Sequence, residues 1–409
     1  MSPTLGVDPM RSPVRYAPVL AAVLLVFGCS QDADSPTGPE SPPALDASAT
    51  TALAFAGMTA GVDFSCGVAT DGRGFCWGWN ADGEVGDGNT IPSNSGQLTP
   101  AAIAGGLRFR QLSAGFNATC GVTTDYRAYC WGRNDRGELG DGTTTQRLTP
   151  VAVVGGHRFS QVEITFETTC GLSYPDNKAW CWGWNSDGEI GNGTRDFASH
   201  STPIAVSGGL TFSRITTGSY HSCGLTTGHK IYCWGLNQDG QLGDGTTTYR
   251  RLTPRLVTGG LTFNWVNAGG ANTCGVTSAN KAYCWGYGKN GQRGDGGVTE
   301  RVSSPRAVFG GHLFTKVNAG GGHTCGVTTS NQAWCWGLNY NGQLGDGTTT
   351  QRLTPHLVAG GLAFNQVSAG SSHTCARTTA AVGYCWGRPF NGQLGNGTTV
   401  LSTTPVKVN

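Results

Sequence analysis

The tripeptide Cys-Trp-Gly occurs seven times at nearly constant spacing, and this repetition constrains the fold more than any other feature of the chain. The copies lie 50 to 54 residues apart and begin at Cys76, Cys130, Cys181, Cys233, Cys284, Cys335 and Cys385. Such a period is typical of architectures in which each unit buries its core against its neighbours. Counting back from Asn409 in seven units of 51 residues reaches residue 53. The repeats therefore fill residues 53–409 and leave no room for a second domain.

Each repeat predicts four short strands. In the unit that starts at Leu261, we expect strands over 261–267, 273–277, 281–285 and 301–309, with a hairpin turn over 278–280. The 66 glycines and only 13% charged residues argue against long solvent-facing helices. A solenoid would need polar capping repeats at its ends, whereas the first and last units here keep the full pattern. The sequence predicts an all-β fold, a closed seven-bladed β-propeller with four-stranded blades.

A longer signature within each unit resembles a known family. Cys-Trp-Gly-x-Asn-x-x-Gly-Gln-Leu-Gly-Asp-Gly-Thr is complete at Cys233–Thr246 and Cys335–Thr348, and Ala-Gly-x-x-His-Thr-Cys-Gly-Val precedes it, as at Ala319–Val327. These residues resemble the RCC1 (regulator of chromosome condensation) repeat, whose fold is a seven-bladed propeller. The resemblance covers about residues 53–409. The prototype of that family is a nuclear guanine-nucleotide exchange factor for a small GTPase.

Fourteen of the 15 cysteines form regular pairs. Each Cys-Trp-Gly cysteine has a partner ten or eleven residues earlier, at Cys66, Cys120, Cys170, Cys223, Cys274, Cys325 and Cys375. Residues at this spacing lie opposite each other across a hairpin, within disulfide range. Seven zinc sites are the alternative, but zinc needs four grouped ligands and each unit offers two. We therefore predict seven disulfides within the blades and no metal.

The N-terminal segment predicts export. Arg11 and Arg15 precede an apolar run, Ala17 to Phe27, which is typical of a secretory signal and too short to span a bilayer. Val26-Phe27-Gly28-Cys29 resembles the lipobox of bacterial lipoproteins, which implies cleavage before Cys29 and its lipidation. The alternative is an ordinary signal peptide that is cut nearby. We expect a signal peptide over 1–28, a Pro- and Ser-rich disordered tether over 29–52 and the propeller over 53–409. The expected location is the cell envelope, with the outer membrane or the cell surface favoured.

The chain shows no recognisable catalytic chemistry. A net charge of +2 gives no electrostatic footprint for nucleic acid. No Ser-His-Asp set, paired carboxylates or cofactor fingerprint is present, so we expect neither an enzyme nor a cofactor. His221, His323 and His373 share one repeat position and are expected to be structural. The central residues of the seven Gly-Asp/Asn-Gly loops are expected to form turns rather than calcium sites: Asp87, Asp141, Asn192, Asp244, Asp295, Asp346 and Asn396.

A binding module for an extracytoplasmic protein is the leading functional hypothesis, in a monomer that meets the membrane only through its anchor. A carbohydrate-binding propeller is the alternative, and exchange-factor activity of the kind known for the family prototype is a further one. Recognition should use positions that differ between blades, and one of them directly follows Cys-Trp-Gly: Trp79, Arg133, Trp184, Leu236, Tyr287, Leu338 and Arg388. Loop residues that could extend this ring are Phe116, Phe166, Tyr220, Tyr340 and Phe390. The competing interpretation is that each ring side chain packs against the adjacent blade.

Overall fold

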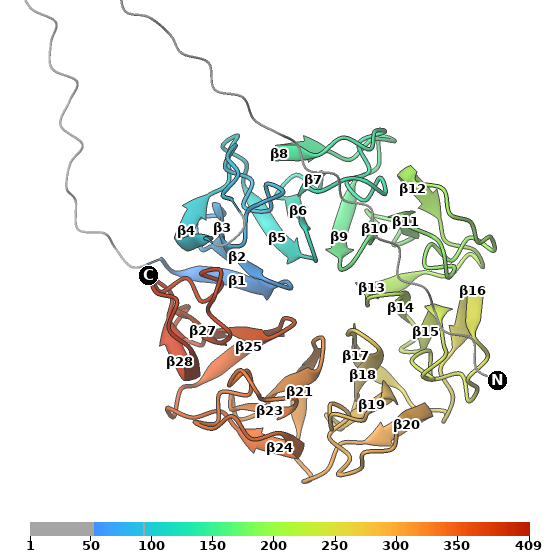
Figure 1. Ribbon diagram of the computed structural model, residues 1–409. Helices are drawn as coiled ribbons and strands as arrows, with labels where there is room; N and C mark the ends of the chain where they lie inside the picture. The colour runs from blue at the N-terminus through green and yellow to red at the C-terminus, as the bar shows by residue number, and fades with distance from the viewer. Residues whose placement is uncertain (1–52, 93–94) are drawn as a thin grey trace, which may run out of the picture. The chain divides into compact units, whose positions relative to one another are not determined.

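The computed structural model describes residues 53–92 and 95–409, and these form a ring of seven four-stranded antiparallel sheets (Figure 1). The predicted signal peptide, Cys29 and the whole of the predicted tether lie outside the described residues. Each blade consists of one continuous stretch of chain, and its strands run in sequence order from the ring axis outward. The prediction of an all-β, seven-bladed propeller is confirmed.

The blades are numbered 1 to 7 in chain order. The innermost strands are β1 (Phe55–Ala60), β5 (Phe109–Ala114), β9 (Phe159–Ile164), β13 (Phe212–Thr217), β17 (Phe263–Ala268), β21 (Phe314–Ala319) and β25 (Phe364–Ala369). The second strands are β2 (Phe64–Ala69), β6 (Ala118–Thr123), β10 (Thr168–Ser173), β14 (His221–Thr226), β18 (Asn272–Thr277), β22 (His323–Thr328) and β26 (His373–Thr378). The third strands are β3 (Gly74–Gly78), β7 (Ala128–Gly132), β11 (Ala179–Gly183), β15 (Ile231–Leu236), β19 (Ala282–Tyr287), β23 (Ala333–Gly337) and β27 (Gly383–Gly387). The outermost strands are β4 (Gln97–Ala102), β8 (Arg147–Ala152), β12 (His200–Ala205), β16 (Arg250–Leu256), β20 (Arg301–Ala307), β24 (Arg352–Leu357) and β28 (Ser402–Lys407).

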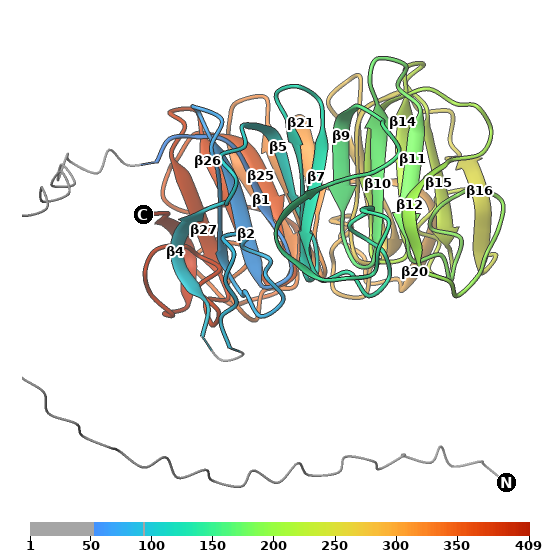
Figure 2. The same cartoon turned by 90° about the horizontal axis from the view of Figure 1, so that it is seen from above.

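The ring closes by packing of the last blade on the first, without exchange of a strand. The backbone N–H of Phe55 donates to the carbonyl of Ala381, and Gln366 of β25 bonds to both backbone groups of Met58. The backbone bond recurs at the other six interfaces, for example from the Phe109 N–H to the Gly72 carbonyl, so the closing interface is one more copy of a repeated joint. The side view in Figure 2 shows the blades standing side by side around the ring.

The tryptophan of Cys-Trp-Gly connects neighbouring blades. Each of the seven indoles is fully buried, and its Nε1 donates to a backbone carbonyl of the preceding blade; Trp131 bonds to Glu84 at 2.9 Å and Trp77 to Gln393 at 3.0 Å. The Gly-Asp/Asn-Gly loop wraps around this indole. A Cβ at Gly86, which has a φ of +77°, would lie 2.4 Å from Nε1 of Trp131. The repeat motif therefore encodes the joint between blades as well as the turn.

The second and third strands carry the predicted disulfides. Seven are present, and each joins the pair of cysteines that the spacing predicts, with Cα atoms 4.0 to 4.1 Å apart. In blade 5, for example, Cys274 and Cys284 lie directly opposite each other in register. The separation of eleven residues between Cys170 and Cys181 keeps the two cysteines in register as well. All second strands except β26 are buried along their whole length, so the disulfides lie inside the core.

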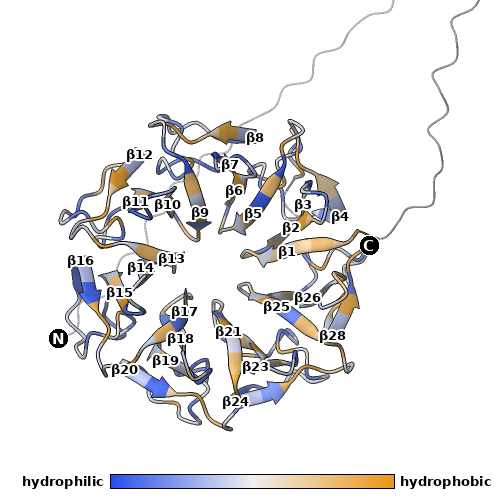
Figure 3. Ribbon diagram, turned by 180° about the vertical axis from the view of Figure 1, so that it is seen from behind, coloured by the Kyte–Doolittle hydropathy of each residue, from blue (hydrophilic) through white to orange (hydrophobic). Residues whose placement is uncertain are grey.

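The inner strands present alternate residues to the core and to the ring axis, and both hydropathy classes appear on them in Figure 3. In β9, Val162 and Ile164 are buried between blades, while Gln161 and Glu163 line a cavity on the axis. This alternation follows from the period of two in a strand. In the described part of the chain, no helix is long and apolar enough to cross a membrane.

Candidate functional site: the loop face

One face of the ring gathers two kinds of loop, and we call it the loop face. It carries the connections between the first and second strands and the start of the connections between the third and fourth strands. The two are tied together within each blade, because the residue after Cys-Trp-Gly donates its N–H to the first connection; Trp184 bonds to Glu167 and Tyr287 to Ala271. The hairpin turns between second and third strands lie at the other end of the blades, which we call the turn face. The predicted ring and most of its predicted extensions therefore share one face.

The seven predicted ring residues differ in accessibility. Six of them are half-buried, whereas Leu236 is only 7% exposed and offers little surface to a partner. Trp79 packs in part against the core between blades 1 and 2. Arg133 and Arg388 lie in ion pairs with Asp135 and Asp63, at 2.7 and 3.4 Å. Leu236 is thus packed into the structure, while part of each of the other six side chains is accessible.

An aromatic row on blades 2 to 4 is the best-defined feature of the loop face. The rings of Phe116 and Phe166 lie 4.8 Å apart, and those of Phe166 and Tyr220 lie 5.3 Å apart. All three side chains are half-buried. Phe116 and Phe166 border a cavity of about 290 Å³ at the ring axis, while blades 5 and 6 contribute Gly270 and Gly321 to its opposite side. The mouth of the ring is therefore aromatic on one side and open on the other.

A second cluster adjoins this row. The guanidinium of Arg136 lies 4.0 Å from the centre of the Trp184 ring and 3.6 Å from Glu167. Phe197, which is 66% exposed, lies with its ring 6.0 Å from that of Trp184. The surface thus combines indole, phenyl and guanidinium groups, and Trp and Arg are enriched in protein-binding hot spots. We refer to Phe116, Phe166, Tyr220, Trp184, Arg136 and Phe197 as the aromatic patch.

Sequence reasoning missed part of this surface. Phe197 and Tyr249 are exposed in the long loops of blades 3 and 4, and the repeat consensus carries no aromatic residue at either position. An aromatic residue in an otherwise polar loop was the available signal. Tyr340 and Phe390, which were predicted, are exposed at the loops of blades 6 and 7.

The acidic residues of the Gly-Asp-Gly loops have local partners. Asp141 accepts hydrogen bonds from the N–H and hydroxyl of Thr143 and pairs with Arg147 of β8 at 2.7 Å. Asp346 makes the corresponding bonds to Thr348 and Arg352. Burial raises the pKa of Asp141 and of Asp346, but these bonds and the adjacent arginine together outweigh it and hold the pKa of both below the usual value. The arrangement is that of a turn pinned to the outer strand, as predicted. No group of three or more His, Cys, Asp or Glu side chains within residues 53–92 and 95–409 could hold a metal.

The three equivalent histidines lie within the blade joints. His221 and His323 bond through Nε2 to Thr273 and Thr374 of the next blade, and His373 bonds to Ser65 across the closing joint, each at 2.8 Å. Burial lowers the pKa of each imidazole to about 3, so all three are neutral at physiological pH. The three histidines therefore have a structural role, in which each one bonds its blade to the next.

The fold and the loop face define a class, that of disulfide-bonded seven-bladed propellers whose face combines aromatic and arginine side chains. Sequence comparison then places the chain within it. Models of the regulator of chromosome condensation (RCC1) repeat match residues 126–165, 176–225, 229–276 and 330–377, and a second model of the same repeat matches 109–138, 212–241 and 314–343. The chain belongs to the RCC1-repeat family.

Relatives and solved structures agree with this membership. The ultraviolet-B receptor UVR8 of Arabidopsis thaliana is 32% identical over 301 residues, which are 72% of this chain and 68% of UVR8. The human E3 ubiquitin-protein ligase HERC2 is 27% identical over 273 residues, 65% of this chain but only 6% of HERC2. Among solved structures, human WBSCR16 (TM-score 0.75, 19% identity, 82% of this chain and 94% of that one) shares the fold. Yeast RCC1 (Prp20), solved with Kap60, does so too (TM-score 0.72, 19% identity, 87% and 85%).

Proposed function

We propose that this chain is an exported, lipid-anchored propeller whose loop face binds an extracytoplasmic protein. The aromatic patch carries the proposal. Trp, Tyr and Arg are enriched among the residues that supply most of the energy in protein interfaces, and the patch places them next to one another on blades 2 to 4, beside the mouth of the ring. The stacking of Arg136 on Trp184 favours a protein over a glycan, because the guanidinium covers an indole face that a sugar would need.

Two solved structures of one relative show that a protein with this fold binds other proteins. Yeast RCC1 (Prp20) was solved bound to Kap60, and a second study of Prp20p from Saccharomyces cerevisiae reports its binding to Gsp1p and histones. Their partners do not transfer to this chain. The seven disulfides favour an oxidising compartment and therefore an extracytoplasmic partner rather than a cytosolic GTPase.

The anchor rests on Val26-Phe27-Gly28-Cys29 and the polar segment that follows. We expect the mature chain to begin at an acylated Cys29, which intact-mass analysis of membrane-extracted protein will show. The Cys29→Ser variant should lose the acyl mass and accumulate as soluble protein or unprocessed precursor. A wild-type mass without acyl groups would contradict the anchor and leave the loop-face proposal standing.

Binding is tested by capture from envelope extract with the full-length chain solubilised in detergent. We expect Phe166→Ala and Trp184→Ala to lose a protein that the wild type retains, each by about 2 kcal/mol, or roughly thirtyfold in affinity. Tyr174→Ala is the matched control, since Tyr174 is an exposed aromatic residue in a hairpin turn of the turn face. Loss of the partner with Tyr174→Ala, or its retention by both loop-face variants, would refute the assignment of the face. Glycan binding without any retained protein would favour the carbohydrate alternative.

A further inference from the structure

The third residue of each innermost strand lines the ring axis, and glutamine is the commonest residue there. The full set is Gly57, Gln111, Gln161, Arg214, Trp265, Lys316 and Gln366. The glutamine side chains form hydrogen bonds to the next blade. The amide of Gln161 accepts from the Ile215 N–H at 3.0 Å and donates to the Ile215 carbonyl at 2.9 Å. Gln366 bonds to Met58 in the same way. Glutamine is therefore the residue that joins neighbouring inner strands at this position.

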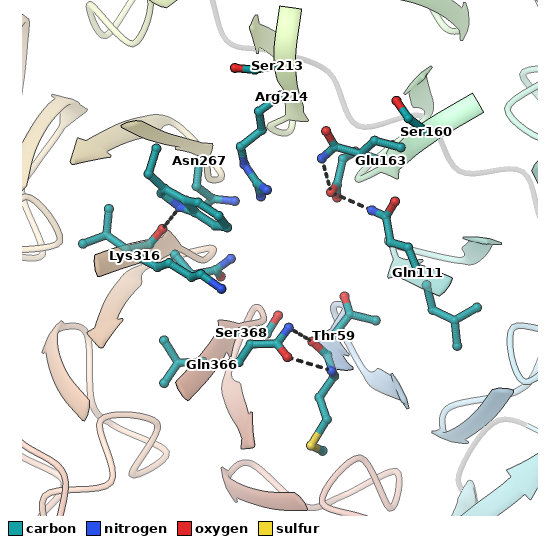
Figure 4. A pocket seen from close by; sticks show the side chains of 17 residues that line it. Thr59, Gln111, Ser160, Glu163, Ser213, Arg214, Asn267, Lys316, Gln366 and Ser368 are labelled. Carbon is teal, nitrogen blue, oxygen red and sulfur yellow. Dashed lines mark hydrogen bonds between the residues drawn. The ribbon is translucent and has the colours of Figure 1, made fainter. Parts of the chain in front are cut away.

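Arg214 and Lys316 depart from this arrangement. Arg214 keeps one bond to the next blade, from Nε to the carbonyl of Val266 at 2.9 Å, and its guanidinium carbon lies 3.7 Å from the centre of the Trp265 ring. The Nζ of Lys316 lies 5.3 Å from the same ring centre and donates no hydrogen bond to any residue that the structure describes. Figure 4 shows Arg214 and Lys316 extending from β13 and β21 into the same space on the axis.

This space has an excess of positive charge. It is a cavity of about 380 Å³, and a neighbouring cavity that shares Lys316 with it is also lined by Arg377 and Arg110. None of these four cations has a carboxylate within 4.0 Å among residues 53–92 and 95–409. Burial and the charges of Arg214 and Arg377 lower the pKa of Lys316. The cations therefore face one another, and no carboxylate of the described residues forms an ion pair with any of them.

The one carboxylate that lines the 380 Å³ cavity, that of Glu163, attracts Arg214 from a distance but bonds to other donors. Glu163 accepts hydrogen bonds from Gln111 and Ser113 at 3.0 Å and from Gln161 at 2.9 Å. These donors lie on β5 and β9, and Figure 4 shows Gln111 and Glu163 across the cavity from Lys316. A half-buried cation without a partner is costly, so an anion from solution would be stabilised between Arg214 and Lys316.

We propose that the axis of the ring binds a small multivalent anion, through carboxylate or phosphate oxygens that pair with Arg214 and Lys316 beside the Trp265 indole. The guanidinium of Arg214 keeps its two terminal nitrogens free of hydrogen bonds to described residues and can grip two oxygens, while Lys316 supplies a point charge. A cavity of about 380 Å³ holds a small molecule and excludes a folded partner. This site lies below the loop face and does not depend on the protein-binding proposal.

The test is isothermal titration of the full-length protein in detergent with inorganic phosphate and with citrate, against chloride at matched ionic strength. We expect saturable binding of at least one probe, weakened at least about tenfold by Arg214→Gln and by Lys316→Gln. Binding of phosphate alone would identify a phosphate site, and binding of citrate alone would identify a carboxylate site. Lys407→Gln, the same charge change on the outer strand β28, should leave the affinity unchanged.

A second measurement separates binding from folding. Without an anion, Lys316→Gln should melt at a higher temperature than the wild type, because the substitution removes repulsion and supplies the amide that bonds to the next blade elsewhere in the ring. With phosphate or citrate present, the wild type should gain melting temperature and the variant should gain little. No saturable binding of either probe, or equal binding by wild type and Lys316→Gln, would overturn the proposal.

Discussion

Three buried carboxyl groups in blades 1 to 3 make the stability of the ring sensitive to alkaline pH. Glu84, Glu138 and Glu189 are at most 2% exposed, and the other four blades have glutamine at the same repeat position. Both residue types accept the same hydrogen bond: the Asp82 N–H donates to Glu84 at 2.9 Å, and the Asn341 N–H donates to Gln343 at 2.9 Å. Glutamine therefore fits the site without a change in geometry.

Burial raises the pKa of Glu84 to about 8 and that of Glu138 and Glu189 to about 7, from an ordinary value of 4.5. At a pH between 4.5 and the raised pKa, the folded chain keeps protons that the unfolded chain has released. The free energy of unfolding therefore falls as pH rises above 4.5. The loss approaches about 3 kcal/mol each for Glu138 and Glu189 and about 5 kcal/mol for Glu84 once the pH exceeds the raised pKa.

The three buried histidines act in the opposite direction. Their pKa is lowered from 6.5 to about 3, so the unfolded chain binds protons that the folded chain does not, and stability is lost as pH falls below 6.5. Between pH 4.5 and 6.5 the two sets offset each other. Above 6.5 the histidines are neutral in both states, and only the carboxyl groups continue to lower stability.

The experiment compares the wild type with the triple variant Glu84→Gln, Glu138→Gln and Glu189→Gln by chemical denaturation at about pH 6.5 and about pH 8.5. We expect the wild type to lose several kcal/mol over this range and the variant to lose much less. The reverse substitution, Gln343→Glu, should introduce the same pH dependence into blade 6 and serves as the matched control. If wild type and triple variant lose stability in parallel, the buried carboxyl groups are not the cause.

Three further predictions concern a disulfide within a blade, a joint between blades and the loop face. Replacing Cys274 and Cys284 together by serine should lower the free energy of unfolding by about 2–3 kcal/mol, measured by guanidinium denaturation; an unchanged midpoint would show that the disulfide does not restrain the unfolded chain. Trp234→Phe removes the indole hydrogen bond to the Glu189 carbonyl at 2.7 Å, while Ser222 still donates to that carbonyl. The free energy of unfolding should therefore fall by about 1 kcal/mol plus a small packing loss, and a far larger fall would contradict this. Trp184→Ala and Tyr287→Ala should each weaken a captured partner by about 2 kcal/mol with little change in melting temperature. A strong drop in melting temperature with unchanged binding would assign both residues to the core.

The strands and disulfides were predictable because local rules determine them. In blade 5 the expected strands 261–267, 273–277, 281–285 and 301–309 correspond to β17, β18, β19 and β20, with ends that differ by at most two residues. Turn residues and alternation of apolar side chains act over a few residues. The spacing of the cysteines reports the register of one hairpin directly.

The loop face was predictable only in part. The position after Cys-Trp-Gly could be placed on one face because equivalent positions in a propeller form a ring. Its exposure could not be predicted, since it differs between blades: Leu236 is buried, and Trp79 packs in part against the core between blades 1 and 2. The same comparison between blades, applied to the third residue of the inner strands, would have drawn attention to Arg214, Trp265 and Lys316.

The sequence by itself determined the period, the blade, the pairing of the cysteines and the family, all of which depend on contacts within about 50 residues. Only the tertiary structure decided which side chains of different blades meet. Arg214 and Lys316 lie on blades 4 and 6 and are 102 residues apart in the chain (316 minus 214), yet they face one cavity with Trp265 between them. That meeting depends on the closure of the ring, which brings seven inner strands onto one axis, and no local pattern in a single repeat specifies it.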